Sequence, residues 1–215
     1  MPSDATTLLP DLRTFVEHRL TEIDGVSAQR RAALAPLAEF VSERFDTGHP
    51  ARLVFICTHN SRRSHMAQLW AQAAAAVFSV PAVETFSGGT EATAFNPRAV
   101  AALRRAGFLI EPFTDGKNPI YEVSFAPGME PMQVFSKTLD AAPINPTDGF
   151  AAVMTCSDAD RACPAVPGAA ARIVIPYDDP KASDCSGREA AAYEERCAQI
   201  AREMLWVFSR VARKA

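Results

Sequence analysis

A continuous apolar run that ends in a cysteine, Leu53–Cys57, limits the folds open to this chain more than any other stretch. Its residues do not alternate between apolar and polar, which is typical of a strand buried on both faces of a parallel sheet. A polar loop follows as far as Arg63, and at Ser64 the sequence passes into a helical pattern. A strand, a short loop and a helix N-terminus in this order predict an anion-binding site.

The loop contains the groups that a bound oxyanion and a nucleophile need. Backbone N–H groups and the helix dipole supply positive potential, and the planar guanidinium group of Arg63 can bind two oxygens of the anion. The same field favours the thiolate form of Cys57, to which Ser64 can donate a hydrogen bond. Asn60 is the loop residue best suited to a left-handed conformation or to side-chain bonds that hold the loop. The alternative is a structural cysteine before a basic loop.

We therefore predict Cys57 as the nucleophile and Arg63 as its partner on the anion. The residues predicted to contact the anion are Thr58, His59, Asn60, Ser61, Arg62, Arg63 and Ser64.

Composition narrows the class of protein. The chain has 215 residues, 48% of them hydrophobic, which suits one large domain or one domain with an appendage. A formal net charge of −3 does not favour a nucleic acid or an anionic membrane as a partner. No apolar run approaches the roughly 20 residues of a membrane span, and the start lacks the order of a signal peptide. We expect a cytoplasmic protein whose five cysteines stay reduced unless they do redox chemistry.

The chain divides into two parts by pattern. Two stripes of apolar residues at helical spacing predict helices over residues 5–46, separated at Asp24-Gly25. We expect this helical hairpin to pack on the rest of the chain or on a second copy in a homodimer. Residues 1–50 are accordingly assigned to an N-terminal extension and residues 51–215 to the catalytic domain.

From Arg52 onward, strand and helix patterns alternate, which predicts an α/β fold with a parallel, flavodoxin-like sheet and helices on both of its faces. Residues 114–148 form an insertion. Within it, the runs Ile120–Phe125 and Gln133–Thr138 predict a β-hairpin or an extra pair of edge strands. The insertion either borders the site and narrows it or has no functional role.

A second group of cysteines follows a later strand. Cys156 ends that strand at the same sheet edge as Cys57, and Cys163 comes seven residues later. A disulfide between Cys156 and Cys163 would require the intervening segment to unwind, and such a strained, exposed bond suits an external reductase. The alternative is that Cys156 is a core residue and Cys163 a loop thiol.

These motifs resemble one superfamily, that of the low-molecular-weight protein tyrosine phosphatases and the thioredoxin-coupled arsenate reductases. The segments Cys57–Ser64, Ser87–Thr90 and Asn96-Pro97 are similar to its phosphate loop and supporting signatures. The run Cys156–Pro164 resembles the redox segment of the reductases. The resemblance implies that Asp179, which precedes a proline after the last strand, is the general acid.

Two activities follow from the resemblance. The first is reduction of arsenate by Cys57, Cys156 and Cys163 in turn, with thioredoxin or a similar dithiol as the reductant and with no metal or tightly bound cofactor. The second is hydrolysis of phosphotyrosine through a phosphorylated Cys57. A non-catalytic anion-binding or redox-sensing protein is a third interpretation, which the complete set of Cys57, Arg63 and Asp179 disfavours.

The sequence departs from the reductase pattern at three positions. Arg62 replaces a cysteine, His59 replaces a glycine, and Gln68 stands where reductases that bind potassium tend to have glutamate, so that no potassium site is expected. Lys181-Ala182 occupies the place of the tyrosines that line the phenol pocket of the phosphatases. Cys185 is given no role.

Overall fold

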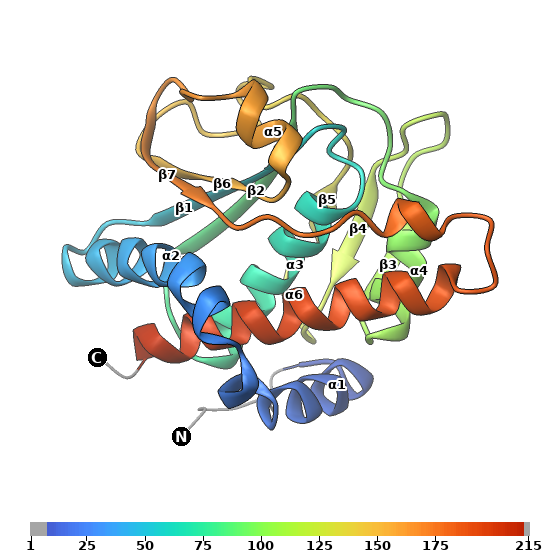
Figure 1. Ribbon diagram of the computed structural model, residues 1–215, viewed down its shortest axis with the longest axis horizontal. Helices are drawn as coiled ribbons and strands as arrows, with labels where there is room; N and C mark the ends of the chain where they lie inside the picture. Colours follow the sequence, from blue (N-terminus) through green and yellow to red (C-terminus); the bar gives the residue numbers. More distant parts are fainter. Residues whose placement is uncertain (1–7, 213–215) are drawn as a thin grey trace.

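A four-stranded parallel sheet lies at the centre of the computed structural model, which describes residues 8–212 (Figure 1). The strand order is β2-β1-β6-β7. The strands are Ala51–Cys57 (β1), Val83–Gly89 (β2), Phe150–Met154 (β6) and Ala169–Val174 (β7). The predicted parallel α/β fold is therefore confirmed, and the strand that ends in Cys57 is one of its two central strands.

Helices cover the two faces of this sheet unequally. They are α3 (Arg63–Val77), α4 (Pro97–Arg105), α5 (Ser157–Ala162) and α6 (Glu189–Ala212). Leu53 and Phe55 belong to the main hydrophobic core with residues of α3 and α6. Val54 and Ile56 face the other way, into a smaller cluster with the short helix α5. Both faces of β1 are buried, which explains its unbroken apolar run.

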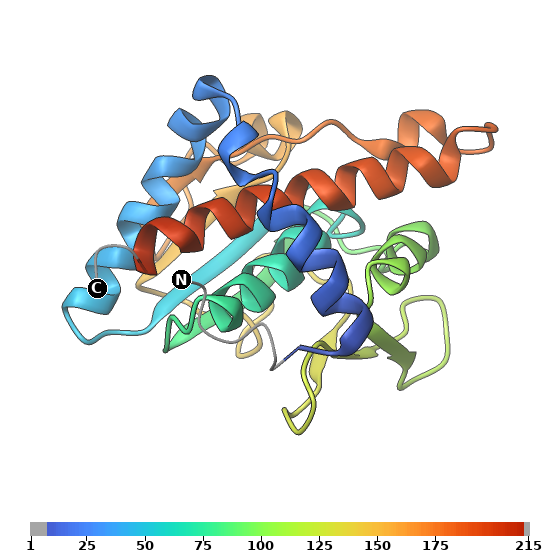
Figure 2. The same ribbon diagram turned by 90° about the horizontal axis from the view of Figure 1, so that it is seen from below.

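Both N-terminal helices contact α6, and the second of them also contacts β7 and β1 of the sheet (Figure 2). They are α1 (Pro10–Leu20) and α2 (Ala28–Asp46), joined through the single-turn helix η2 (Ile23–Gly25). The helix expected from residue 5 begins at Pro10, and residues 5–7 lie outside the described part. Contacts between α1 and α2 themselves are few, so α6 holds the pair together rather than a closed hairpin interface.

A close backbone approach fixes α1 on the domain. Gly107 has a φ of +103°, and a Cβ atom there would lie 2.1 Å from the backbone nitrogen of Leu12. Only glycine satisfies both conditions. Leu12 is fully buried in the main core, as are Val16, Leu34 and Leu37. The division of the chain at residue 50 stays a prediction.

The insertion contributes two strands to a small, separate antiparallel sheet. Its strands, in the order β3-β4-β5, are Leu109–Pro112, Tyr121–Ser124 and Met132–Val134. The predicted hairpin is thus present, and it pairs with β3, a strand that the sequence did not indicate. β4 bonds to β3 and β5, so the strands of this hairpin lie outside the four-stranded sheet. After β5 the chain runs back to the end of β2, where Thr138 pairs with Gly89.

Within the described part of the chain, no helix has both the length and the apolar character needed to cross a bilayer.

Candidate active site

The polar loop joins the carboxyl end of β1 to the N-terminus of α3, as the sequence predicts (Figure 1). Cys57 is the last residue of β1, its side chain is buried, and its Sγ lies 3.1 Å from Oγ of Ser64. Ser64 is in the first turn of α3, so the thiol sits at the positive end of the helix. The end of the helix and the hydroxyl group of Ser64 thus both face the sulfur of Cys57.

Asn60 determines the direction of the hydrogen bond to the sulfur. Its Oδ1 accepts from the backbone N–H of Lys137 at 2.9 Å, and its Nδ2 donates to Ser64 Oγ at 2.9 Å. Because Ser64 Oγ accepts this bond, its own proton is available to Cys57 Sγ. Asn60 is fully buried and has a φ of +42°. Both expectations for this residue, the left-handed conformation and the side-chain bonds, are confirmed.

The end of β2 supports the loop from one side. A Cβ on Gly89 would lie 2.7 Å from the backbone nitrogen of Asn60 and 2.7 Å from the carbonyl oxygen of Thr58. The Thr58 carbonyl also accepts from the N–H of Glu91 and from the hydroxyl of Thr90. Close packing without a side chain at Gly89 therefore keeps the loop against the sheet.

The returning chain of the insertion supports the loop from a second side. Ser136 Oγ donates to the carbonyl of His59 at 3.0 Å, and the Lys137 N–H bonds Asn60 as described above. Lys137 is itself buried, which lowers its pKa to about 8. The insertion thus borders the site through its residues 136 and 137, which the sequence did not single out.

Arg63 is bound to the acid loop in this structure. Its Nη2 donates to Oδ2 of Asp179 at 2.7 Å, and its Nη1 donates to the carbonyl of Tyr177 at 3.0 Å. Its Nε is buried and has no hydrogen-bond partner among the described residues. The other carboxylate oxygen, Oδ1 of Asp179, accepts from the N–H of Lys181 in the single-turn helix η3 (Pro180–Ser183). The structure therefore brings Cys57, Arg63 and Asp179 to one place, with a donor of Arg63 still free for an anion.

Two residues predicted to contact the anion use their side chains elsewhere. Arg62 Nε donates to the hydroxyl of Tyr193 at 2.8 Å, and its Nη2 lies 3.8 Å from a carboxylate oxygen of Asp184. Two partners far along the chain thus hold its guanidinium group, and a contact between Arg62 and the anion stays a prediction. The side chain of His59 is 44% exposed and lies 3.8 Å from Glu91, so it belongs to the rim of the site.

The remaining predicted contacts are a threonine and a serine of the loop. Thr58 Oγ1 lies 3.5 Å from Sγ of Cys156, between the loop and the second cysteine. Ser61 Oγ donates to the carbonyl of Ala94 at 2.7 Å, which ties the loop to the chain before α4. Their backbone N–H groups, rather than their hydroxyls, are the donors left to an anion.

Cys156 and Cys163 stand at the two ends of α5. Cys156 is buried and caps the helix, with its Sγ accepting from the backbone N–H of Ala159 at 3.3 Å. Cys163 is the C-terminal cap and is partly exposed. The backbone N–H of Thr155 donates to the carbonyl of Ile56, so the strand ends that precede Cys156 and Cys57 are neighbours. All five cysteines are free thiols in this structure.

His65, which follows Ser64 on α3, is the most strongly perturbed titratable group near the loop. It is fully buried, and burial together with the positive charge of Lys137 lowers its pKa to about 3. Its Nε2 lies 3.2 Å from the carbonyl of Phe135. The imidazole is therefore neutral across the physiological range and is not a proton donor to the anion.

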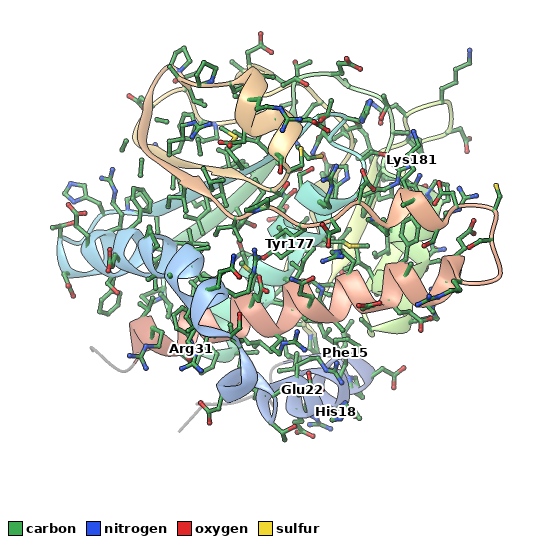
Figure 3. All side chains as sticks on the ribbon, viewed as in Figure 1. Phe15, His18, Glu22, Arg31, Tyr177 and Lys181 are labelled. Atoms are coloured by element: carbon green, nitrogen blue, oxygen red, sulfur yellow. The ribbon has the colours of Figure 1, made fainter. Side chains whose placement is uncertain are left out.

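A pocket of about 450 Å³ opens beside the loop. Four basic side chains contribute to its lining: His59, Arg62, Lys117 and Lys181. None of the described residues that line it is acidic, and none has a phenyl, phenol or indole ring. Lys181 lies toward the edge of the molecule, whereas Tyr177 lies in its interior (Figure 3). Elsewhere in residues 8–212, no group of three or more His, Cys, Asp or Glu side chains is placed to bind a metal ion.

Comparison with known proteins places this geometry in context. No protein-family model matches the chain. An arsenate reductase from Brevibacillus brevis is 31% identical over 128 residues, which cover 60% of this chain and 75% of that protein. Arsenate reductase 2 from Staphylococcus haemolyticus is 30% identical over 128 residues, covering 60% and 77%.

Among solved structures, a low-molecular-weight phosphotyrosine phosphatase from Vibrio cholerae O395 superposes with a TM-score of 0.51. It is 12% identical and covers 74% of this chain and 95% of its own. At that identity the likeness concerns the fold alone.

Proposed function

The chain belongs to the low-molecular-weight protein tyrosine phosphatase superfamily and is related within it to arsenate reductases, and from this premise we propose that it reduces arsenate to arsenite. The observation that carries the proposal is the position of Cys156. Its thiol is buried within 3.5 Å of a side chain of the anion loop, at the strand end next to that of Cys57. Hydrolysis of a phosphomonoester through Cys57 does not require a second thiol there.

The first step is attack by the Cys57 thiolate on arsenic. The anion sits among the backbone N–H groups of the loop and takes Arg63 as a ligand. Asp179 delivers a proton to the departing oxygen, which leaves as water. The product is a covalent adduct with a Cys57 sulfur–arsenic bond, and arsenic is still in its oxidised state.

The second and third steps are thiol exchange. The Cys156 thiolate attacks Cys57 Sγ, the sulfur–arsenic bond breaks, and its electron pair stays on arsenic, which leaves as arsenite. Cys163 then attacks Cys156, which releases Cys57 as a thiolate and leaves a Cys156–Cys163 disulfide. Thioredoxin or a similar dithiol reduces this bond. Overall, two thiols are oxidised to a disulfide while arsenate becomes arsenite and water.

The ion pair between Arg63 and Asp179 places the proposed acid beside the proposed anion ligand. Nη2 of Arg63 lies 2.7 Å from Oδ2 of Asp179. An arsenate that binds the guanidinium group therefore has the Asp179 carboxyl group next to it, within reach of the departing oxygen.

Hydrolysis of phosphotyrosine is the alternative that the same loop allows, because Cys57, Arg63 and Asp179 are sufficient for a cysteinyl-phosphate intermediate. The lining of the adjacent pocket weighs against it. Lys181 and three other basic residues line that pocket, and no aromatic ring there offers a stacking surface for a phenol. A small oxyanion requires no such surface.

The test is arsenate-dependent NADPH oxidation in the presence of thioredoxin and thioredoxin reductase. We expect turnover by the wild type, none by Cys156→Ser, and a single equivalent of arsenite per molecule from Cys163→Ser, because Cys57–Cys156 then has no resolving thiol. Cys185→Ser, at an exposed cysteine, is the matched control and should keep full activity.

Hydrolysis of p-nitrophenyl phosphate by the same preparations separates the two activities. The proposal predicts that any hydrolysis survives Cys156→Ser. Robust hydrolysis without any arsenate turnover in the wild type would show that the protein is a phosphatase.

A further inference from the structure

We propose that Arg30, on the N-terminal helix α2, positions the acid loop, so that the N-terminal helices are part of the catalytic apparatus. The acid loop is defined here as residues 175–179, between β7 and η3. The inference rests on the proposed function in so far as that function gives Asp179 and Arg63 their roles. Its structural basis is a chain of contacts from α2 to these two side chains.

Arg30 joins three separate segments. Its Nε and Nη2 donate to the two carboxylate oxygens of Glu203 on α6, at 3.0 and 2.6 Å. Its Nη1 donates to the carbonyl of Pro176 at 3.0 Å, and its guanidinium carbon lies 5.0 Å from the ring centre of Tyr177. The Glu203 side chain is only 3% exposed, so this bidentate pair is shielded from water on the Glu203 side.

Arg30 and Arg63 bind consecutive carbonyl groups of the acid loop. Arg30 takes the carbonyl of Pro176, and Arg63 takes that of Tyr177 at 3.0 Å. The N–H of Tyr177 donates to the carbonyl of Thr155, beside Cys156. Two residues further on, Asp179 meets Arg63 at 2.7 Å. The backbone conformation of residues 176–179 therefore determines the positions of both Asp179 and the Arg63 guanidinium group.

Few contacts other than those of Arg30 hold the acid loop in place. β7 ends at Val174, so the acid loop is held by individual bonds rather than by a complete strand ladder. Pro176 has no N–H group, and its carbonyl is its one backbone hydrogen-bonding group. Tyr177 is buried in the interior (Figure 3), under the guanidinium group of Arg30. Without Arg30, the Pro176 carbonyl and one face of the Tyr177 ring lose their contact with α2.

A purely structural arginine on the same helix provides the comparison. Arg44 donates from Nη2 to the carbonyl of Gly149 at 3.1 Å, and its guanidinium carbon lies 5.1 Å from the ring centre of Phe40. It ties α2 to the start of β6 and touches no residue of the acid loop. Arg44→Ala therefore removes an anchor of α2 but no support of the acid loop.

The first measurement is amide hydrogen exchange, which needs no substrate. We expect Arg30→Ala to speed exchange in the peptide covering residues 175–182 by about tenfold or more, and Arg44→Ala to leave it within about twofold. Unchanged exchange in Arg30→Ala would overturn the proposal, whatever reaction the protein catalyses. The outcome is thus independent of whether arsenate proves to be the substrate.

The second measurement separates positioning from stability. In Arg30→Ala we expect kcat to fall by about 10- to 100-fold with KM within about threefold, since a misplaced acid slows the step without weakening the anion loop. With aryl phosphates, the rate should become more sensitive to the pKa of the leaving group.

A second variant covers the case in which Arg30→Ala folds poorly. The paired replacement R30M/E203L restores apolar packing and should show the same loss of kcat. A stable variant with unchanged kcat and exchange would show that Arg30 only fastens α2.

Discussion

Asn60 has three roles in the anion loop, and each depends on a different part of the residue. Its backbone takes a φ of +42°, its Oδ1 satisfies the buried N–H of Lys137, and its Nδ2 directs the Ser64 proton toward Cys57. Glycine would keep only the first role. Aspartate would keep the second and would place a negative charge beside the nucleophile. Asn60 therefore acts on the sulfur of Cys57 through Ser64, without a hydrogen bond of its own to that sulfur.

His65 predicts a dependence of stability on pH. Its pKa is lowered to about 3 in the folded protein, against about 6.5 when unfolded, so only the unfolded state binds a proton between these values. The contribution of His65 is complete above about pH 6.5 and is lost as the pH falls toward 3, by up to about 5 kcal/mol. Urea unfolding of the wild type and His65→Gln at pH values of about 7, 5.5 and 4 measures this. Parallel pH curves for the two proteins would contradict the assignment to His65.

At the scale of elements, α5 separates the two cysteines of the proposed relay. The helix places Cys156 at its N-terminal cap and Cys163 at its C-terminal cap, so they meet only if it unwinds. Arg172 of β7 opposes this motion. Its Nε donates to the carbonyl of Cys163 at 3.0 Å, and its Nη2 donates to the carbonyl of Asp160 at 2.8 Å. The last turn of α5 is thereby tied to the edge strand of the sheet.

Removal of this tie should make the disulfide easier to form. In Arg172→Met we expect a Cys156–Cys163 bond to appear about 5- to 10-fold faster under a mild thiol oxidant, as two partly exposed hydrogen bonds are worth about 1–1.5 kcal/mol. Mass spectrometry of alkylated peptides follows the bond. Arg52→Met, which removes a side chain paired with Glu84 at the protein surface, is the control. Equal rates in both variants would mean that α5 opens without resistance from Arg172.

At the scale of the whole molecule, one hydrophobic core extends from the N-terminal helices to the small antiparallel sheet. Leu12 and Leu37 are fully buried in the same cluster as Leu53 of β1 and Val123 of β4. α6 contacts α1 and α2 of the N-terminal part as well as α3 of the remaining chain (Figure 2). The N-terminal helices thus bury a face of α6 that would otherwise be apolar and open to water.

We therefore expect the chain to unfold in one transition. Leu12→Ala and Leu37→Ala should each cost about 2–5 kcal/mol of the free energy of unfolding, as large cavities do in a shared core. Both should lower a single midpoint, followed by circular dichroism of the helices and by fluorescence of the buried Trp70. Two separate transitions, only the first of them shifted, would show instead that residues 1–50 form an independent unit.

The parts of the fold and the site that were predictable are those set by local pattern. The apolar run before Cys57, the helix after it and the left-handed Asn60 follow from burial periodicity and from which residues tolerate a positive φ. The partner of Arg62 was not predictable in this way, because Tyr193 is 131 residues distant in the chain. For the same reason no local pattern indicated that Arg30 contacts the chain beside Asp179. The strand β3 was not predicted because its four residues become a strand only by pairing with β4.

Cys156 and Cys163 lie at opposite ends of the six-residue helix α5, so the oxidation state of these two thiols is linked to whether the helix is formed. If the relay runs as proposed, a molecule that has completed the reaction lacks the intact α5 that a reduced molecule displays. A reductant can therefore distinguish the oxidised enzyme from the reduced enzyme by the shape of this surface, before thiol exchange begins. The dithiol reductant would then bind mainly oxidised enzyme, and enzyme that is already reduced would not compete for it.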